Sequence, residues 1–319
     1  MKRLFSVLLA VTLCLGCLSF ANADSTPLIY HVTDAEGHEV WLLGTIHMGD
    51  ADVMYPISGM DQILEKCDTL ALEISEDDYF DSIEANTKEN MALYFSQQLS
   101  FLPMIENSGM MTNGVSEEVL RRIAEPFEVE GLERLLAYME PLSLVSMATL
   151  ANGLNAGMST TDGVDVILHS LFRTCGKQII GLETGESQDE ILMNQSNELW
   201  VSQLNTMADV WDSCTDCYRQ LVEAWSVGNR EELNRIMNDM QGVEGGSVGG
   251  DLQAENESFA VAMTDLRDAA FTEKIVELLK NGGKVLVAIG SAHIYGDGAV
   301  ADQLKAAGYT VEPVVYDVE

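Results

Sequence analysis

The stretches WLLGTIHMGD (residues 41–50) and LVAIGSAHIYGDG (residues 286–298) repeat one pattern, in which an apolar run is followed by Gly-x-x-His and then by Gly-Asp. The first places His47 three residues after Gly44, and the second places His293 three residues after its own glycine. A short apolar run bounded by glycine is typical of a buried strand. Glycine also permits a tight turn or a close backbone approach as the chain leaves the strand. The repeat therefore predicts two strands that each deliver a histidine at the carboxyl end.

Two further apolar runs have the same character. DTLALEIS (residues 68–75) carries Glu73 near its end, and KQIIGLET (residues 177–184) carries Glu183. All four runs are short, rich in Leu, Ile and Val, and followed by helical periodicity, which predicts a mostly parallel sheet. Ligands of open parallel sheets bind beyond the carboxyl ends of the strands. We therefore expect two histidines and two glutamates, all able to bind metal, to meet at one edge.

The order of the predicted elements indicates an α/β fold with a mostly parallel central sheet. The repeated pattern opens and closes the domain at residues 24–319, which suggests two related halves. Amphipathic helical segments at about 84–160 and 187–240 form a large helical insertion. The glycine-rich segment 242–250 is expected to be a mobile loop that connects helices.

Strands are also expected at both ends of this domain. LIYHV (residues 28–32) and EVWLL (residues 39–43) are separated by a polar turn and predict an antiparallel hairpin. YTVEPVV (residues 309–315) follows the last helical segment and predicts a closing strand.

The first 23 residues have the features of an export signal. Lys2 and Arg3 precede an apolar run at residues 4–18, and Ala21-Asn22-Ala23 matches a small-x-small cleavage site. We expect cleavage after Ala23 and a mature protein that is secreted, periplasmic or in the cell envelope. The run is shorter than the roughly 20 apolar residues of a membrane span. The alternative is a lipid anchor on Cys17, so contact with a membrane is expected only through the signal peptide or this anchor.

The charge of the chain excludes nucleic acid as an expected partner. The formal net charge is -34, from 51 acidic and 17 basic residues, and an acidic surface repels phosphate. The acidic residues are dispersed, which is typical of a solvated surface.

Four cysteines remain after removal of the signal: Cys67, Cys175, Cys214 and Cys217. Export predicts an oxidising compartment, so structural bridges in any of three pairings, or unpaired thiols, are the favoured interpretations. Cys214-Thr-Asp-Cys217 lies in a helical segment without the preceding strand of a redox motif, and no second CxxC supports a four-cysteine zinc site.

The residue types at the predicted sheet edge favour a divalent metal site. Neutral imidazole is the commonest metal ligand, and carboxylates complete such sites for Mn, Co or Zn. We therefore predict His47, His293, Glu73 and Glu183 as metal ligands, with Glu73 and Glu183 also competing for the role of general base. Glu73 is preferred as the base because it follows the first Gly-x-x-His directly. A single Gly-x-x-His would be explained by a histidine that caps backbone groups or fills space at the end of a strand. Here the pattern occurs twice, which favours a metal site.

The other histidines lack such a context. His31 and His38 lie in the predicted hairpin, and His169 follows Asp165 by four residues, which predicts a helical i, i+4 pair.

Four stretches in the same order resemble the TraB/GumN family, which includes the Tiki proteins. They are WLLGTIHMGD, LALEI, GVDVILHSLFRTCGKQIIGLET and VAIGSAHIYGDGAVADQLKAAGYTVEPV. The resemblance implies an erythromycin-esterase/ChaN-like fold and metal-dependent hydrolysis, because Tiki members are proteases that use Mn or Co. It also implies a role at the site for Arg267. The family usually has Arg-Asn at this point, whereas this chain has Arg267-Asp268.

Two classes of function follow from these observations. The first is an exported metal-dependent hydrolase, a peptidase acting on a peptide or another small substrate. The second is a non-catalytic protein that binds haem or a small ligand in the same cleft, as ChaN relatives do. The pair of glutamates favours the enzyme, because a haem binder needs axial donors but no general base.

Overall fold

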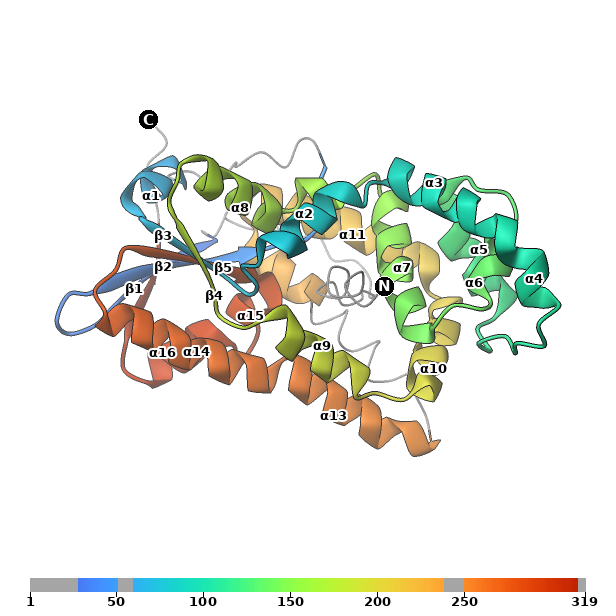
Figure 1. The fold of residues 1–319 in the computed structure, drawn as a ribbon. Coiled ribbons are helices and arrows are strands. Elements are labelled where there is room, and N and C mark those ends of the chain that lie inside the picture. The colour runs from blue at the N-terminus through green and yellow to red at the C-terminus, as the bar shows by residue number, and fades with distance from the viewer. Residues whose placement is uncertain (1–27, 51–59, 238–249, 315–319) are drawn as a thin grey trace.

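A computed structural model describes residues 28–50, 60–237 and 250–314 (Figure 1). The predicted export signal and most of the glycine-rich segment 242–250 lie outside these residues.

One six-stranded sheet, in the order β4-β3-β5-β2-β1-β6, forms the centre of the molecule. The first four strands of that order are parallel, whereas β1 pairs antiparallel with both β2 and β6. The predicted α/β fold with a mostly parallel sheet is confirmed, as are the hairpin and the closing strand. The strands are β1 (Ile29–Thr33), β2 (Glu39–Thr45), β3 (Thr69–Leu72), β4 (Gln178–Gly181), β5 (Val285–Gly290) and β6 (Thr310–Pro313).

The central strands are hydrophobic because helices cover both faces of the sheet. Every residue of β5 is buried, as expected for a parallel strand packed on both sides. Helix α8 packs on β3 and β4, while α14 and α15 pack on β2. Figure 1 shows α1 and α8 on one side of the sheet and α14 and α16 on the other.

Eight α-helices of the described chain precede β4. Four of them, α3 to α6, lie together at the end of the molecule that is farthest from the sheet (Figure 1). The eight helices are α1 (Met60–Lys66), α2 (Asp77–Ala85), α3 (Lys88–Gln98), α4 (Leu102–Glu106), α5 (Glu117–Ala124), α6 (Leu132–Leu136), α7 (Pro141–Asn155) and α8 (Val164–Thr174), with short 3-10 helices η1 (Leu99–Phe101), η2 (Glu125–Phe127) and η3 (Thr160–Asp162).

The remaining helices follow β4 and β5. They are α9 (Gly185–Met193), α10 (Asn197–Met207), α11 (Trp211–Ser226), η4 (Gly250–Leu252), α13 (Gln253–Met263), α14 (Asp265–Lys280), α15 (Ser291–Tyr295) and α16 (Val300–Ala306). None of the helices in the described part of the chain has the length and apolar character needed to cross a membrane. Cys67, Cys175, Cys214 and Cys217 are present as thiols. Burial raises the pKa of Cys67 to about 12, whereas Cys175 is exposed.

Gly44 is required in β2 by close packing rather than by a turn. A Cβ at this position would lie 2.4 Å from Cε2 of Tyr295 and 2.9 Å from the backbone Cα of Ser291. The Gly44 N–H donates to the Tyr295 hydroxyl at 2.8 Å, and its carbonyl accepts from Trp225 Nε1 at 2.8 Å. The first Gly-x-x-His unit is thereby locked against α15, the helix that carries the second histidine.

Gly44→Ala is expected to lower the free energy of unfolding by about 1–3 kcal/mol, because the added methyl group overpacks a buried contact. Urea unfolding monitored by circular dichroism measures this loss. Gly283→Ala is the matched control, since its Cβ would come no closer than 3.4 Å to a side chain, that of Val285. Equal stability of the two variants would contradict the packing explanation.

Candidate active site

The four predicted ligands follow four adjacent parallel strands. His47 follows β2, Glu73 follows β3, Glu183 follows β4, and His293 lies on α15 directly after β5. Because Thr45 pairs with Gly290 and Leu72 pairs with both Ala288 and Gly181, the carboxyl ends of these strands lie nearly level. The sheet therefore directs all four side chains to one edge.

Each histidine is oriented by an aspartate from a helix. His47 Nδ1 lies 3.0 Å from Asp165 Oδ2, and His293 Nδ1 lies 2.6 Å from Asp268 Oδ1. In both pairs the Nδ1–H donates to the carboxylate, which leaves Nε2 as the nitrogen available to a ligand. Metal-binding histidines commonly have such a carboxylate partner. Asp268, which stands where the family usually has asparagine, thus still provides a hydrogen-bond acceptor for His293.

Gly163 allows α8 to approach close enough for the first of these pairs. A Cβ at Gly163 would lie 2.5 Å from the His47 carbonyl oxygen, and the Val164 N–H donates to the Ile46 carbonyl at 2.9 Å. The amino end of α8 is therefore seated on the backbone next to His47. This position carries Asp165, in the first helical turn, to the imidazole.

Arg267, from α14, connects the other side chains. Its Nη2 donates to Glu73 Oε2 at 2.5 Å and also forms an ion pair with Glu183, while its Nε lies 3.1 Å from Glu183 Oε1. Its Nη1 lies 3.0 Å from His293 Nε2. Because a guanidinium only donates, His293 Nε2 accepts this hydrogen bond and carries no proton. A buried cation thus contacts three of the four predicted ligands.

Gly290 leaves a small space between the remaining donor atoms. A Cβ at this glycine would lie 3.1 Å from Glu73 Oε1, 3.5 Å from His47 Nε2 and 3.6 Å from His293 Cδ2. The Gly290 N–H donates to Glu73 Oε1 at 2.7 Å. Both histidines and Glu73 therefore surround a point that any other amino acid would fill.

The charges at the site shift the pKa values of its buried groups. Burial alone would raise the pKa of Glu73, but its interactions with Arg267, His293, His47 and the Gly290 N–H together outweigh burial and lower this pKa to about 2. Burial likewise opposes protonation of His47, yet the charge and hydrogen bond of Asp165 raise its pKa above the usual value. Burial and the charges of Asp165 and Glu73 raise the pKa of Tyr79 well above its usual range, so its phenol retains the proton.

A pocket with about 300 Å³ of empty space, part of it open to solvent, adjoins these groups on the side of α2 and α8. Its polar lining consists of Thr45, His47, Glu73, Tyr79, Asp165 and Gln188, and its other walls are aliphatic or aromatic. Glu183 does not line this pocket; its Oε1 accepts from Gln188 Nε2 at 3.4 Å. Of the two glutamates, Glu73 is thus the one that faces the pocket.

The chemistry of these residues fits a divalent cation, although their arrangement is not that of a closed metal shell. Two imidazole Nε2 atoms and two carboxylates form a donor set that suits Mn, Co or Zn, and the space at Gly290 lies between three of the groups. The ligand atoms are not all within 4.8 Å of one another. Arg267 supplies the positive charge between the carboxylates in this structure.

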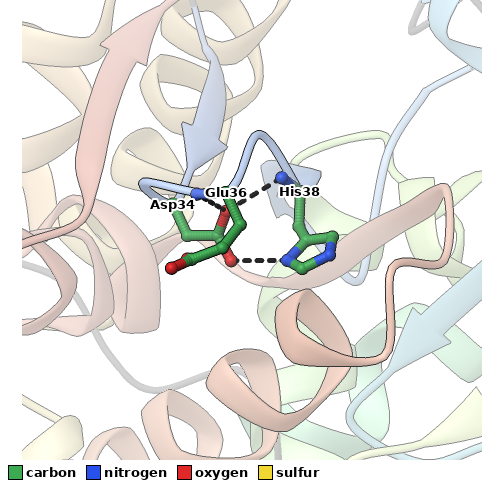
Figure 2. Close-up of side chains that lie close together, drawn as sticks. All are labelled: Asp34, Glu36 and His38. Atoms are coloured by element: carbon green, nitrogen blue, oxygen red, sulfur yellow. Dashed lines mark hydrogen bonds and ion pairs between the residues drawn. The ribbon is translucent and has the colours of Figure 1, made fainter.

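Among the described residues, only Asp34, Glu36 and His38 meet that 4.8 Å criterion. Figure 2 shows them in the turn between β1 and β2. Asp34 Oδ1 accepts from the backbone N–H of Glu36 at 3.0 Å and of His38 at 2.8 Å, and Asp34 Oδ2 lies 2.7 Å from His38 Nδ1. Aspartate commonly closes turns in this way, so we interpret the cluster as a turn cap.

Sequence reasoning missed several groups at the site. Asp165 was expected to pair with His169, but its carboxylate faces His47, while His169 stacks on Phe80 with ring centroids 3.8 Å apart. Thr45, Tyr79 and Gln188 were not singled out. The signal for Asp165 was its place in GVD, where Gly163 permits the close approach to His47.

Comparison with known proteins agrees with this arrangement of motifs. The model of the TraB/PrgY/gumN family matches residues 28–313. No curated protein and no solved structure was found to match the chain. The family match begins just before β1, ends in β6 and includes both Gly-x-x-His units with the glutamates between them. The chain belongs to the TraB/PrgY/gumN family.

Proposed function

We propose that this chain is an exported metal-dependent hydrolase that cleaves an amide or ester bond in a peptide or another small substrate. The observation that carries the proposal is the pair of aspartate-held histidines beside two glutamates, because each aspartate holds Nδ1 and leaves Nε2 as the ligand atom of the imidazole. In this structure His293 Nε2 accepts from Arg267. His47 and His293 would hold Mn, Co or Zn, and Glu73 and Glu183 would share the roles of further ligand and general base. Such a metal polarises a carbonyl group and lowers the pKa of bound water.

The protein groups have separate tasks in this proposal. Asp165 and Asp268 keep the imidazoles in the ligand-binding tautomer and orientation. Arg267 balances the charges of Glu73 and Glu183, which would otherwise repel each other and electron-rich substrate atoms. Glu73 is assigned the role of proton acceptor despite its lowered pKa, because it lines the pocket and only two of its roughly four lone-pair sites are occupied by described hydrogen bonds.

The size of the pocket supports a small substrate group. The empty space of about 300 Å³ in this pocket includes space that is open to solvent, so its enclosed part is smaller than the roughly 300–1,000 Å³ that is common for small-molecule sites. It suits a side chain or a short peptide segment better than a haem macrocycle. We therefore favour the hydrolase over the haem-binding alternative.

Hydrolysis of a peptide library with and without a chelator tests the proposal. We expect the chelator to abolish turnover and Mn, Co or Zn to restore it. A His47→Ala, His293→Ala double variant should lose both bound metal and turnover. His31→Ala is the control, because His31 lies on β1, where it stacks on Trp41 and contacts Glu39. Turnover that is insensitive to the chelator would contradict the proposal, and haem binding without turnover would support the alternative.

Export is a separate part of the proposal, and it depends on residues 1–23. Mass spectrometry of the protein recovered from outside the cytoplasm should show a chain that begins at Asp24, because Ala21 and Ala23 provide the cleavage site. Lipid on Cys17 would instead indicate an anchored protein, and an intact Met1 would contradict processing.

A further inference from the structure

Two residues that line the pocket each carry a buried polar atom with no hydrogen-bond partner among the described residues. The atoms are Thr45 Oγ1 and Asp165 Oδ1, and their residues are only 2% and 7% exposed. Buried polar groups in native proteins are nearly always paired, because an unpaired one loses its hydration without compensation. These atoms therefore point to a hydrogen-bonding group that is supplied from outside the protein.

Each of these two residues forms a hydrogen bond through another of its atoms. The Thr45 carbonyl accepts from Ser291 Oγ at 2.9 Å, which ties β2 to α15. Asp165 Oδ2 holds His47 Nδ1 at 3.0 Å. These contacts hold the Thr45 backbone and the Asp165 carboxylate in place while leaving Thr45 Oγ1 and Asp165 Oδ1 unused. A preorganised pair of this kind is what a binding subsite requires.

The charge of the pocket selects the kind of group that fits. A carboxylate oxygen is only an acceptor, so the partner of Asp165 Oδ1 must donate a hydrogen. Asp165 and Glu73 both line the pocket, so phosphate, sulfate or carboxylate would be repelled. An ester oxygen has no hydrogen to donate. A nitrogen that carries hydrogen fits the charge and donates to Asp165 Oδ1, and the Thr45 hydroxyl can accept a second hydrogen where the nitrogen carries one.

We infer that the pocket is a subsite for an N–H donor of the substrate, either an amide N–H or a primary ammonium group. The assignment of this donor to a substrate rests on the proposed hydrolase function, and it favours amides over esters as the bond that is cleaved. A site built to hydrogen-bond an N–H group rejects the analogue that lacks it, because the buried partner atoms are then left unpaired. Thr45 is in this view a specificity-determining residue.

Small probes test the subsite without any need for turnover. Two N–H donors, N-methylacetamide and ethylammonium, are titrated into chelator-treated protein, and the shifts of the backbone amide signals of Thr45 and Asp165 are followed by NMR. N,N-dimethylacetamide is the matched probe that lacks the N–H. At least one donor should bind roughly tenfold or more tightly than the dimethyl compound, since hydrogen bonds to a charged group are among the stronger ones. Which donor binds separates the amide source from the ammonium source.

The variants Thr45→Val and Thr45→Ser test whether the preference for the N–H donor depends on the Thr45 hydroxyl. Valine keeps the shape and removes the unpaired hydroxyl, so the fold should be as stable as before or more stable. The preference for the N–H donor should shrink in Thr45→Val and persist in Thr45→Ser. Equal binding of the dimethyl compound, an unchanged preference in Thr45→Val, or no binding of either donor would overturn the inference. The last result would mean that a buried water satisfies both atoms.

The two proposals fail in different ways. If the chain is not a hydrolase, the N–H donors still bind the chelated protein, but peptide turnover is absent. If the subsite is wrong, chelator-sensitive turnover remains while Thr45→Val cleaves a peptide and its matched ester in the same ratio as the wild type.

Discussion

Arg267→Met is expected to lower the free energy of unfolding of the metal-free protein by about 3–5 kcal/mol, the usual cost of removing one partner from a buried ion pair. Arg267 is 5% exposed, and its guanidinium contacts Glu73 and Glu183 together with His293 Nε2. Methionine fills similar volume but leaves both carboxylates without their cation. Urea unfolding in the presence of a chelator measures the effect.

Arg121→Met provides the matched control. Arg121 also forms an ion pair with a glutamate, Glu118, at 2.8 Å, but its side chain is 53% exposed. Water and salt screen such a pair, so its loss should cost less than about 1 kcal/mol. If Arg267→Met were no more destabilising than Arg121→Met, the buried cation would not be holding the site together.

A second substitution identifies the cause of the destabilisation. Adding Glu73→Gln to Arg267→Met removes one of the two uncompensated charges, so the double variant should be more stable than the sum of the single changes predicts. The coupling energy of this double-mutant cycle reports the interaction of Arg267 with Glu73 itself. Additive effects would assign the loss to packing around the methionine instead.

Glu73→Gln is expected to reduce the proposed hydrolysis by about 10²- to 10⁴-fold, the usual contribution of a general base. Glutamine keeps the shape of the side chain, and its carbonyl oxygen can still accept from the Gly290 N–H, but it does not accept a proton from water. The variant should retain more bound metal than His47→Ala, because glutamine leaves both imidazoles in place. The measurements are kcat on a peptide substrate and metal content after dialysis.

Two other glutamates serve as comparisons for this prediction. Glu76→Gln changes an exposed acid three residues away, which accepts from backbone N–H groups of Ser75 and Gly185, and it should leave kcat close to the wild-type value. Glu183→Gln removes the carboxylate that does not line the pocket. If Glu73→Gln were as active as the wild type and Glu183→Gln inactive, the base would be Glu183.

The sequence by itself determined the sheet and the edge at which its polar residues gather. Runs such as VLVAIG, in β5, are apolar at every position, and only a strand buried on both faces accommodates that pattern. Parallel strands place their carboxyl ends together, so His47 and Glu73 had to lie near one another once the strands were identified. These inferences depend on the pattern of apolar residues within one short stretch of sequence, and contacts with distant residues are not needed to recognise it.

Only the tertiary structure decided how the polar side chains pair. Asp165 lies four residues before His169 on α8, but its carboxylate contacts His47, 118 positions earlier in the chain. That choice depends on the seating of α8 against β2, which Gly163 permits. Arg267 likewise reaches Glu73 across 194 positions, because α14 brings its guanidinium to the sheet edge.

The unpaired state of Thr45 Oγ1 and Asp165 Oδ1 was likewise decided only by the tertiary structure. Nothing around Thr45 in the sequence distinguishes its hydroxyl from any other at the end of a strand. Its lack of a partner is known only once the neighbouring residues from α2, α8 and β5 are in place. Periodicity records which residues are buried, whereas hydrogen bonding and charge compensation depend on distances of about 3 Å between groups that packing brings together. The strands could therefore be predicted from the sequence, whereas the pairing of the polar side chains at their ends could not.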